Sequence, residues 1–221
     1  MRPRITLLHA TQVAVDPVKA EFLARWPEAE LVNLLDDSLS PDRARDGSLT
    51  DEMIERFVSF GRYGASLGAE GMLVTCSAFG PAIERLATEV PIPVLKPNEA
   101  MFELAVSKGS RIGMLATFGP AVATMEDEFS EYVARTGSSA TLQTVLVEDA
   151  MKALRSGDSA THNRLLAEHV KDLGPVDIVM LAHFSTSRAV SAVSAATELP
   201  VLSAPGSAVE RMRQMVAPET D

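Results

Sequence analysis

The chain alternates short apolar runs with amphipathic stretches from one end to the other. Several of the runs are dominated by Val, Ile, Leu and Met, the pattern expected of parallel strands that are covered on both faces. The predicted strands are Arg4–Ala10, Glu30–Leu35, Gly71–Thr75, Pro93–Leu95, Arg111–Ala116, Ala140–Leu146, Asp177–Ala182 and Pro200–Leu202. The stretches between them have helical periodicity. This alternation predicts an α/β protein whose parallel strands are joined by right-handed helical crossovers.

The stretch Thr50–Leu67 is the clearest of the predicted helices. Thr50 occupies a favourable N-cap position, because its hydroxyl can accept a hydrogen bond from a backbone N–H of the first turn. The apolar residues of this stretch recur at helical spacing and predict one buried face. They are Met53, Ile54, Phe57, Val58 and Phe60.

The chain also contains an internal repeat with a constant spacing of 107 residues. The segment beginning at Arg4 resembles the one beginning at Arg111 (111 − 4 = 107), and the run ending at Cys76 resembles the one ending at His183 (183 − 76 = 107). The later Pro-Val-Leu runs, Phe22 with Phe129, and Asp51 with Asp158 obey the same spacing. Since one offset relates all of these regions, we interpret the chain as two homologous βαβαβαβ halves.

The ends of the predicted strands carry the candidate chemistry, because ligands of open parallel sheets bind beyond the carboxyl ends of the strands. Cys76 and His183 follow equivalent strands of the two halves. If a pseudo-twofold axis relates the halves, a cleft between them would place the thiol and the imidazole on opposite walls.

Cys76 is the only cysteine, which excludes an intramolecular disulfide and a cysteine-rich metal site. It precedes a predicted turn into a helix, where backbone N–H groups favour the thiolate and can bind a carboxylate. The alternative is a cysteine buried as a small apolar residue.

His183 follows an apolar strand, and an imidazole there can take or give a proton near neutral pH. The alternative is a histidine that forms hydrogen bonds at a domain interface; the equivalence with Cys76 favours a functional role. His162 and His169 lie in a predicted helix and are explained by a solvated face. His9 ends a strand, where both a functional and a structural role remain open.

Four short hydroxyl side chains follow the strands and are candidate substrate-binding groups: Thr11, Ser77, Thr117 and Ser185. Together with backbone N–H groups, such hydroxyls can hold the oxygens of a carboxylate. Each alone is explained more simply as a helix N-cap, and Ser77 and Thr117 are the better candidates for substrate binding. The adjacent carboxylates Asp36 and Asp37 indicate a surface turn, and Arg188 faces either an acidic substrate or solvent.

Several classes of site are disfavoured because their motifs are missing. No HExxH or other metal-ligand spacing occurs, so no metal is expected. Neither GxGxxG nor GxxxxGK[ST] follows a strand, which argues against nucleotide binding, and the absence of GxSxG argues against an α/β-hydrolase.

Composition limits which binding partners and which cellular compartment are expected. The formal net charge of −10 and the aromatic content of 5% disfavour nucleic acid, which requires cationic and stacking surfaces. A mean hydropathy of +0.09 is typical of globular proteins. No apolar run is long enough to cross a membrane, and the N-terminus is a poor secretion signal, so a cytoplasmic protein is expected.

The segments Val74-Thr75-Cys76-Ser77, Leu181-Ala182-His183 and Gly113–Thr117 resemble motifs of the aspartate/glutamate racemase superfamily. That superfamily includes glutamate, aspartate and hydantoin racemases, maleate cis–trans isomerases and arylmalonate decarboxylases. The resemblance implies two pseudo-symmetric flavodoxin-like lobes, each with a four-stranded parallel sheet, an active-site cleft between them, and no cofactor. It also implies that the last segment returns to the first lobe, which gives lobes of residues 1–96 plus 203–221 and residues 97–202.

The resemblance further implies acid–base chemistry at Cys76. Racemases of this family use two cysteines on opposite sides of the substrate carbon; Cys76 matches the first, and His183 stands at the second position. A thiolate and an imidazolium, with reference pKa values of roughly 8.5 and 6.5, can act as base and acid.

We therefore expect a cofactor-independent racemase or isomerase of a small carboxylate, such as an amino acid or a derivative. A homodimer is the default assembly for an enzyme of this size. Three alternatives remain open: a decarboxylase in which Cys76 protonates one face, a cis–trans isomerase in which Cys76 adds covalently, and a carboxylate-binding protein without turnover.

Overall fold

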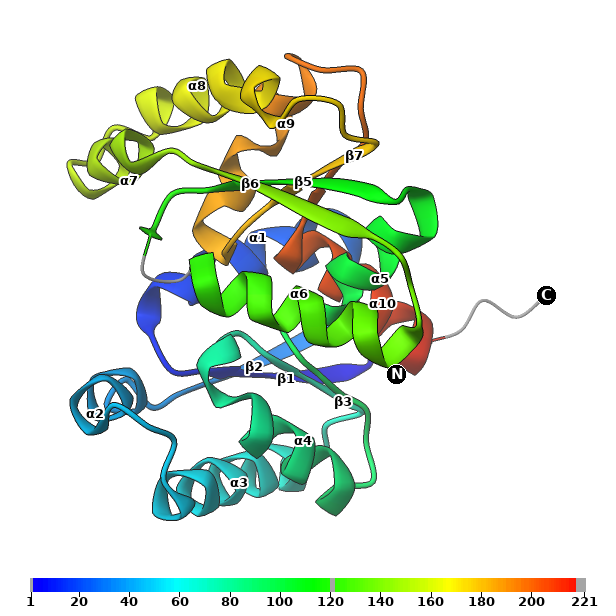
Figure 1. Cartoon of the computed structure of the whole chain (residues 1–221). Coiled ribbons are helices and arrows are strands. Elements are labelled where there is room, and N and C mark those ends of the chain that lie inside the picture. The colour runs from blue at the N-terminus through cyan, green and yellow to red at the C-terminus, as the bar shows by residue number, and fades with distance from the viewer. Residues whose placement is uncertain (1, 120–121, 218–221) are drawn as a thin grey trace. The chain divides into compact units, whose positions relative to one another are not determined.

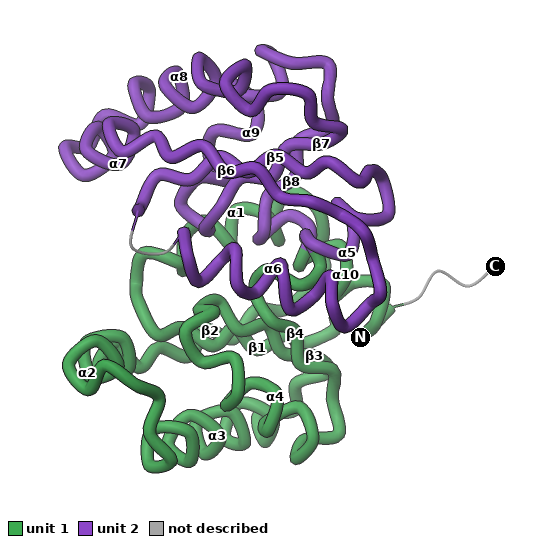
Figure 2. The backbone as a smooth tube through the Cα atoms, viewed as in Figure 1, with its two compact units in different colours: residues 1–100, 208–221 green, residues 101–207 purple. Residues whose placement is uncertain are grey.

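The computed structural model describes residues 2–119 and 122–217. The chain divides into two compact units, Met1–Ala100 with Ala208–Asp221 (unit 1) and Met101–Ser207 (unit 2), coloured separately in Figure 2. The sequence-based boundaries were 96/97 and 202/203. The contacts instead place both changes of unit inside helices, α5 (Glu99–Lys108) and α10 (Ala204–Val216).

Eight strands occur where the apolar runs predict them (Figure 1). They are β1 (Arg4–His9), β2 (Glu30–Leu35), β3 (Gly71–Val74), β4 (Val94–Leu95), β5 (Arg111–Ala116), β6 (Thr141–Leu146), β7 (Ile178–Leu181) and β8 (Val201–Ser203). They form two four-stranded parallel sheets, β2-β1-β3-β4 in unit 1 and β6-β5-β7-β8 in unit 2. The predicted α/β class with two four-stranded parallel sheets is confirmed.

The strand register reproduces the 107-residue repeat. Ile5 pairs with Gly71 in unit 1, and Ile112 pairs with Ile178 in unit 2, so both partners are shifted by 107 (112 − 5 and 178 − 71). The outer strand departs from this spacing: Arg4 pairs with Glu30, whereas Arg111 pairs with Thr141, a shift of 111 (141 − 30). Extra residues before β6 therefore conceal the equivalence of β2 and β6 in a search at one offset.

Helices cover both faces of each sheet, which explains the continuous apolar runs of the inner strands. In unit 1, Figure 1 shows α3 (Asp51–Ser66) and α4 (Gly80–Glu89) on one face and α1 (Val15–Arg25) and α10 on the other. In unit 2, α7 (Glu148–Arg155), α8 (Ser159–His169) and α9 (Val190–Ser194) lie on one face and α5 and α6 (Val122–Thr136) on the other. The short helices are η1 (Gln12–Ala14), η2 (Ser77–Phe79), η4 (Val170–Leu173) and η5 (Phe184–Ala189), and α2 spans Leu39–Asp46.

Helix α3 has the N-cap and the buried face that the sequence predicts. The Thr50 hydroxyl accepts a hydrogen bond from the Met53 backbone N–H at 3.2 Å. Met53, Phe57 and Val58 are buried, and the Phe57 ring stacks on Phe79 with centroids 5.1 Å apart. Because Phe79 belongs to the turn after Cys76, this stack ties that turn to the core of unit 1.

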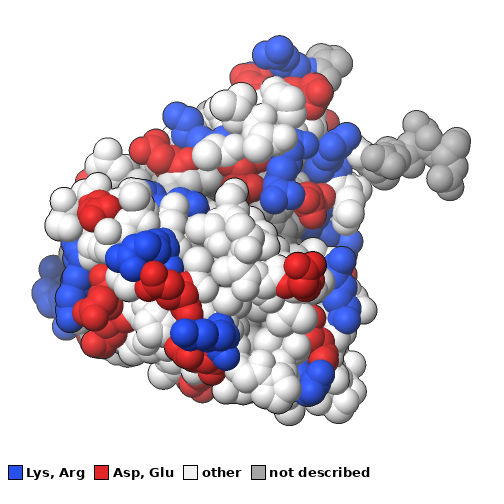
Figure 3. Space-filling view, turned by 90° about the horizontal axis from the view of Figure 1, so that it is seen from above, with Lys and Arg blue, Asp and Glu red and all other residues white. Residues whose placement is uncertain are grey.

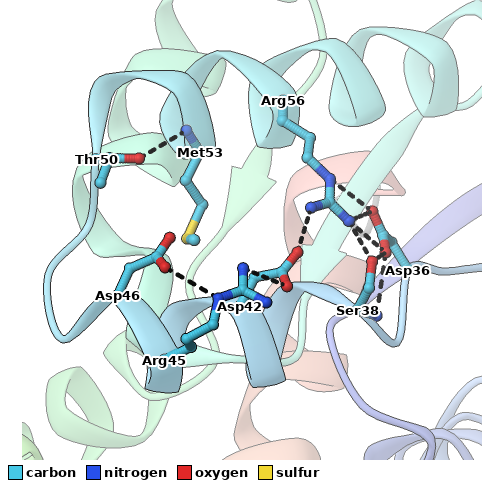
Figure 4. Close-up of polar contacts among 8 residues, drawn as sticks. All are labelled: Asp36, Ser38, Asp42, Arg45, Asp46, Thr50, Met53 and Arg56. Carbon is cyan, nitrogen blue, oxygen red and sulfur yellow. Dashed lines mark hydrogen bonds and ion pairs between the residues drawn. The ribbon is translucent and has the colours of Figure 1, made fainter.

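An ion-pair cluster fixes the turn after β2 (Figure 4). Arg56 of α3 donates to Asp36 Oδ1 at 2.8 Å and to Asp42 Oδ2 at 2.7 Å, and it also bonds Ser38. The Ser38 hydroxyl donates to Asp36 at 2.6 Å. Asp36 therefore serves a structural turn, as the sequence indicated.

The visible face in Figure 3 shows acidic and basic side chains interspersed. Within the described residues, no helix has the length and apolarity to span a membrane, and no group of three or more His, Cys, Asp or Glu side chains is arranged to hold a metal ion.

The contact between α3 and α4 depends on Gly61. A Cβ at Gly61 would lie 2.9 Å from Cγ of the buried Leu86 and closer still to both Leu86 methyl carbons. Glycine-to-alanine changes normally stabilise a helix interior by about 1 kcal/mol. We expect Gly61→Ala instead to lower the free energy of unfolding by roughly 1–3 kcal/mol, because the added methyl overpacks the core.

Urea unfolding of Gly61→Ala beside Gly80→Ala measures this effect. Gly80 in α4 is the matched control, since no atom lies within 4 Å of its added Cβ. Equal stability of Gly61→Ala and the wild type would contradict the close approach.

Candidate active site

Cys76 lies where strand β3 gives way to a helix. Its backbone is extended (φ −132°, ψ 118°), and the next residue begins η2, which leads directly into α4. The side chain is partly exposed and packs at the edge of the unit 1 core. The thiol is therefore not enclosed in the core, and it lies at the carboxyl end of the sheet as expected.

A hydrogen-bonded histidine lies directly beneath this turn. His9 Nδ1 is 2.9 Å from Thr75 Oγ1, and His9 Nε2 is 3.1 Å from Asn33 Oδ1. His9 is only 1% exposed. Burial lowers the pKa of His9 below its usual value, and the bond to Asn33 opposes this in part. The sequence left the role of His9 open and did not single out Asn33; the only signal was a polar residue ending an apolar strand.

His183 has the most unusual backbone of the described residues. Its φ of 68° and ψ of 155° make it the only non-glycine there with a positive φ. This conformation is nearly restricted to glycine and costs about 1–3 kcal/mol in other residues. Strain of this kind is found most often at functional sites.

The imidazole of His183 is neutral in the resting protein. Its Nε2 is buried and has no hydrogen-bond partner among the described residues. Burial lowers the pKa of His183 from 6.5 to about 4. The expected imidazolium therefore does not describe the resting state, because the site offers the proton no compensating partner.

Thr117 and His183 lie on adjacent strands at the same level of the unit 2 sheet. Leu115 pairs with Leu181, and each of these two residues follows its paired leucine by two positions. Thr117 is 1% exposed, and its Oγ1 is buried without a partner among the described residues. Two buried polar atoms thus lack partners at one sheet edge, which is costly unless a ligand or water supplies them.

The other candidate hydroxyls do not act as helix caps. Thr11 is the N-cap residue of η1 but forms no capping hydrogen bond through its side chain. Ser77 begins η2 and Ser185 lies within η5; both are partly exposed at the strand ends. Arg188 donates to Ser185 O at 3.0 Å and to Ser159 Oγ at 3.3 Å, so it has a local structural role.

Arg155 is a candidate that the sequence analysis missed. Its guanidinium carbon lies 5.6 Å from the ring centroid of Phe118, which directly follows Thr117. Phe118 is 39% exposed, and Arg155 forms no ion pair within residues 2–119 and 122–217. Arg155 ends α7, far along the chain from any strand end, so only the fold brings its cation beside Phe118.

The structure of α8 corrects the expectation that His162 and His169 both lie on a solvated face. His162 is fully buried, with Nδ1 2.8 Å from Asn163 Oδ1, and does not lie on a solvated face. His169 is on an exposed face, 2.7 Å from Asp172. The difference arises because one side of α8 packs against η5 and α9.

Comparisons with known proteins were made for the sequence and for the fold. A family model described as Asp/Glu/Hydantoin racemase matches residues 8–175. A search of curated protein sequences gave no match.

Solved structures match nearly the whole chain at low identity. Allantoin racemase from Klebsiella pneumoniae has a TM-score of 0.75 at 16% identity, covering 97% of this chain and 88% of its own. Picrophilus torridus aspartate racemase has a TM-score of 0.71 at 13% identity, covering 99% and 96%. A glycine-to-cysteine mutant of arylmalonate decarboxylase also scores 0.71, at 15% identity, covering 99% and 95%. At these identities the similarity establishes the shared fold.

The neutral state of His183 predicts a pH dependence of stability. Between pH 6.5 and about 4, His183 binds a proton in the unfolded chain but not in the folded protein. The free energy of unfolding therefore falls as the pH decreases through this window. Over this window His183 lowers the free energy of unfolding by about 3 kcal/mol.

Urea unfolding at pH 7 and at pH 4.5 measures this loss. We expect His183→Gln to lose less stability than the wild type over this interval, whereas the exposed-site control His169→Gln behaves as the wild type. Equal losses in His183→Gln and the wild type would show that His183 is not held neutral.

Proposed function

Because the chain belongs to the Asp/Glu/hydantoin racemase family, we propose that it is a cofactor-independent racemase or isomerase of a small carboxylate, with Cys76 and His183 as its proton-transfer groups. The observation that carries the proposal is His183: a strained, neutral imidazole with a buried, unpartnered Nε2 at the repeat position equivalent to Cys76. Strain and an unsatisfied polar atom have no structural benefit by themselves.

The neutral imidazole sets the order of proton transfers. Nε2 of His183 accepts the α-proton, and the Cys76 thiol donates its proton to the opposite face of the carbanion. The product has the opposite hand, and the enzyme is left with an imidazolium and a thiolate. The reverse reaction starts from that charged pair, or solvent exchange returns the pair to imidazole and thiol.

Hydroxyl donors and a cation support the developing negative charge. The Thr117 hydroxyl lacks a partner and can donate to a substrate oxygen. Thr11, Ser77 and Ser185 are the further donors of this proposal, and Arg155 supplies the positive charge for the carboxylate. Preorganised donors of this type stabilise an enediolate more than its parent acid, which lowers the barrier to proton removal.

Deuterium exchange at the α-carbon tests the proposal. The probes are aspartate, glutamate and allantoin in deuterated water, followed by NMR together with optical rotation. We expect at least one probe to exchange its α-proton and to racemise. The rate of racemisation is expected to fall about 10²–10⁴-fold in Cys76→Ala and in His183→Gln. Racemisation that survives in Cys76→Ala would remove the thiol from the mechanism.

A decarboxylase is the second candidate, and the neutral His183 favours it, because a decarboxylase needs an acid on one face only. The C–C bond to the departing CO₂ breaks, and the electron pair left on carbon takes the Cys76 proton. With α-methylphenylmalonate as the probe, whose α-carbon is prochiral, this reaction gives one enantiomer of 2-phenylpropanoate. His183→Gln would retain CO₂ release while Cys76→Ala loses it, whereas a racemase loses its activity in both variants.

The remaining alternatives have their own signatures. Covalent cis–trans isomerisation of maleate would leave a Cys76 adduct detectable by mass spectrometry under quench. A binding protein would be stabilised by a carboxylate in a thermal-shift assay, with no exchange, isomerisation or CO₂ release.

The proposed carboxylate contact of Arg155 gives a separate prediction. Arg155→Met removes a charge-assisted hydrogen bond of about 1.5–3 kcal/mol, so we expect KM to rise roughly tenfold or more with kcat little changed. Arg135→Met is the matched control, since Arg135 is also exposed in unit 2 and lies 5.4 Å from the Tyr132 ring centroid, on α6. An equal KM in Arg155→Met and the wild type would exclude this contact.

A further inference from the structure

A chain of hydrogen-bonded polar side chains, exposed at Asn33 and buried at His9 and Thr75, crosses three neighbouring strands of unit 1 beneath Cys76. It runs from Asn33 on β2 through His9 on β1 to Thr75, the residue after β3, and β1 lies between β2 and β3 in the sheet. His9 is 1% exposed and Thr75 is 7% exposed. Thr75 is covalently bonded to Cys76, so this chain ends at the residue that carries the thiol.

Each polar group of this chain has a partner within hydrogen-bond distance. Leu8 O accepts both the Thr75 backbone N–H at 3.0 Å and the Thr75 hydroxyl at 3.2 Å. The same hydroxyl oxygen lies 2.9 Å from His9 Nδ1, and His9 Nε2 lies 3.1 Å from Asn33 Oδ1. Burial lowers the pKa of His9 below its usual value.

The hydroxyl bond of Thr75 is the last tie between β3 and β1 before the thiol. The strand pairing ends at Leu8 with Val74, and only the Thr75 N–H continues the ladder. Beyond Thr75 the chain leaves the sheet at Cys76 and turns into η2. A side chain that fixes Thr75 therefore fixes the start of the turn that carries the thiol.

Unit 2 shows that the sheet does not need this chain in order to fold. The residues equivalent to His9 and Thr75 are Ala116 and Ala182 (9 + 107 and 75 + 107), and both are fully buried. The equivalent of Asn33 on the outer strand is Thr144, whose buried Oγ1 has no partner among the described residues. The same strand register is built there without a polar chain, so its presence in the thiol-bearing unit requires another reason.

We infer that Thr75, whose hydroxyl is held by Leu8 O and by His9, is a positioning residue for Cys76. This role rests on the proposed catalytic use of the thiol, and it names residues that hold the thiol without touching the substrate. With the tie in place, Cys76 is held at the N-cap of η2, and backbone N–H groups at the start of a helix favour a thiolate. Without it, the turn loosens and the thiol becomes less acidic.

The reactivity of Cys76 tests the inference without any knowledge of the substrate. Because Cys76 is the only cysteine, its alkylation by iodoacetamide can be followed by intact mass across pH 6–10. We expect Thr75→Val to raise the midpoint of this profile by about half a pH unit and to slow alkylation at pH 7 about threefold, since the thiolate fraction falls by that factor. Thr75→Ser keeps the hydroxyl and is expected to match the wild type.

Thr6→Val is the matched control for the loss of a buried threonine hydroxyl. Thr6 lies on β1 of the same sheet, is fully buried, and donates to Gly64 O at 3.1 Å, away from the strand ends. It is expected to lose stability as Thr75→Val does but to keep the wild-type alkylation profile. If Thr75→Val does not fold, Asn33→Ala at the exposed end of the chain provides a milder shift in the same direction.

The inference is overturned if the profiles of Thr75→Val and Asn33→Ala superimpose on the wild type, or if Thr6→Val shifts the profile equally. The outcome is separable from that of the proposed function, since alkylation reports the thiol whether or not exchange occurs. Where Cys76→Ala abolishes turnover, Thr75→Val is expected to lower kcat with KM unchanged.

Discussion

The parallel strand ladder is the constraint on which the candidate site depends. In each unit the pairing places the ends of neighbouring strands at one edge of the sheet. Residues two positions past a paired couple therefore follow the strands at the same level. Thr117 and His183 reach the same edge in this way. Burial of the inner strands on both faces makes a register slip expensive, because a slip of one residue would exchange the faces of every side chain.

The two units use the same backbone plan for different chemistry. In unit 1, His9 and Thr75 are buried beneath the strand ends and are hydrogen-bonded to each other. Cys76 follows them in an ordinary extended conformation. Unit 2 has alanines at those positions and places a strained, unpartnered histidine at the next one. One edge is thus satisfied internally and the other is left unsatisfied, which is the state expected of a surface that receives a ligand.

The neutral His183 separates the possible reactions more sharply than the family does. Proteins of similar fold include racemases and a decarboxylase. A racemase needs two groups that exchange protons, whereas a decarboxylase needs one. A pKa of about 4 makes His183 a weak base in the resting protein. Proton transfer through Nε2 is therefore the step on which the racemase interpretation depends.

The amino-acid sequence by itself determined the architecture. Apolar runs predicted all eight strands, the 107-residue spacing predicted two similar halves, and the Thr50 cap and the apolar stripe of α3 are present as read, since these features depend on local periodicity. The same spacing singled out Cys76 and His183 as equivalent positions. The sequence did not reveal the four-residue difference at β6, because insertions break a constant offset.

Tertiary structure decided the burial, the protonation state and the contact partners of the site residues. Whether His9 is structural, whether His162 is solvated, and whether His183 carries a charge all depend on burial and on partners distant in sequence. Asn33 meets His9, and Arg155 meets Phe118, only because separate strands and helices are packed together. Residue type sets what a side chain can do near neutral pH, whereas desolvation and hydrogen bonding by the fold set which of those states it occupies.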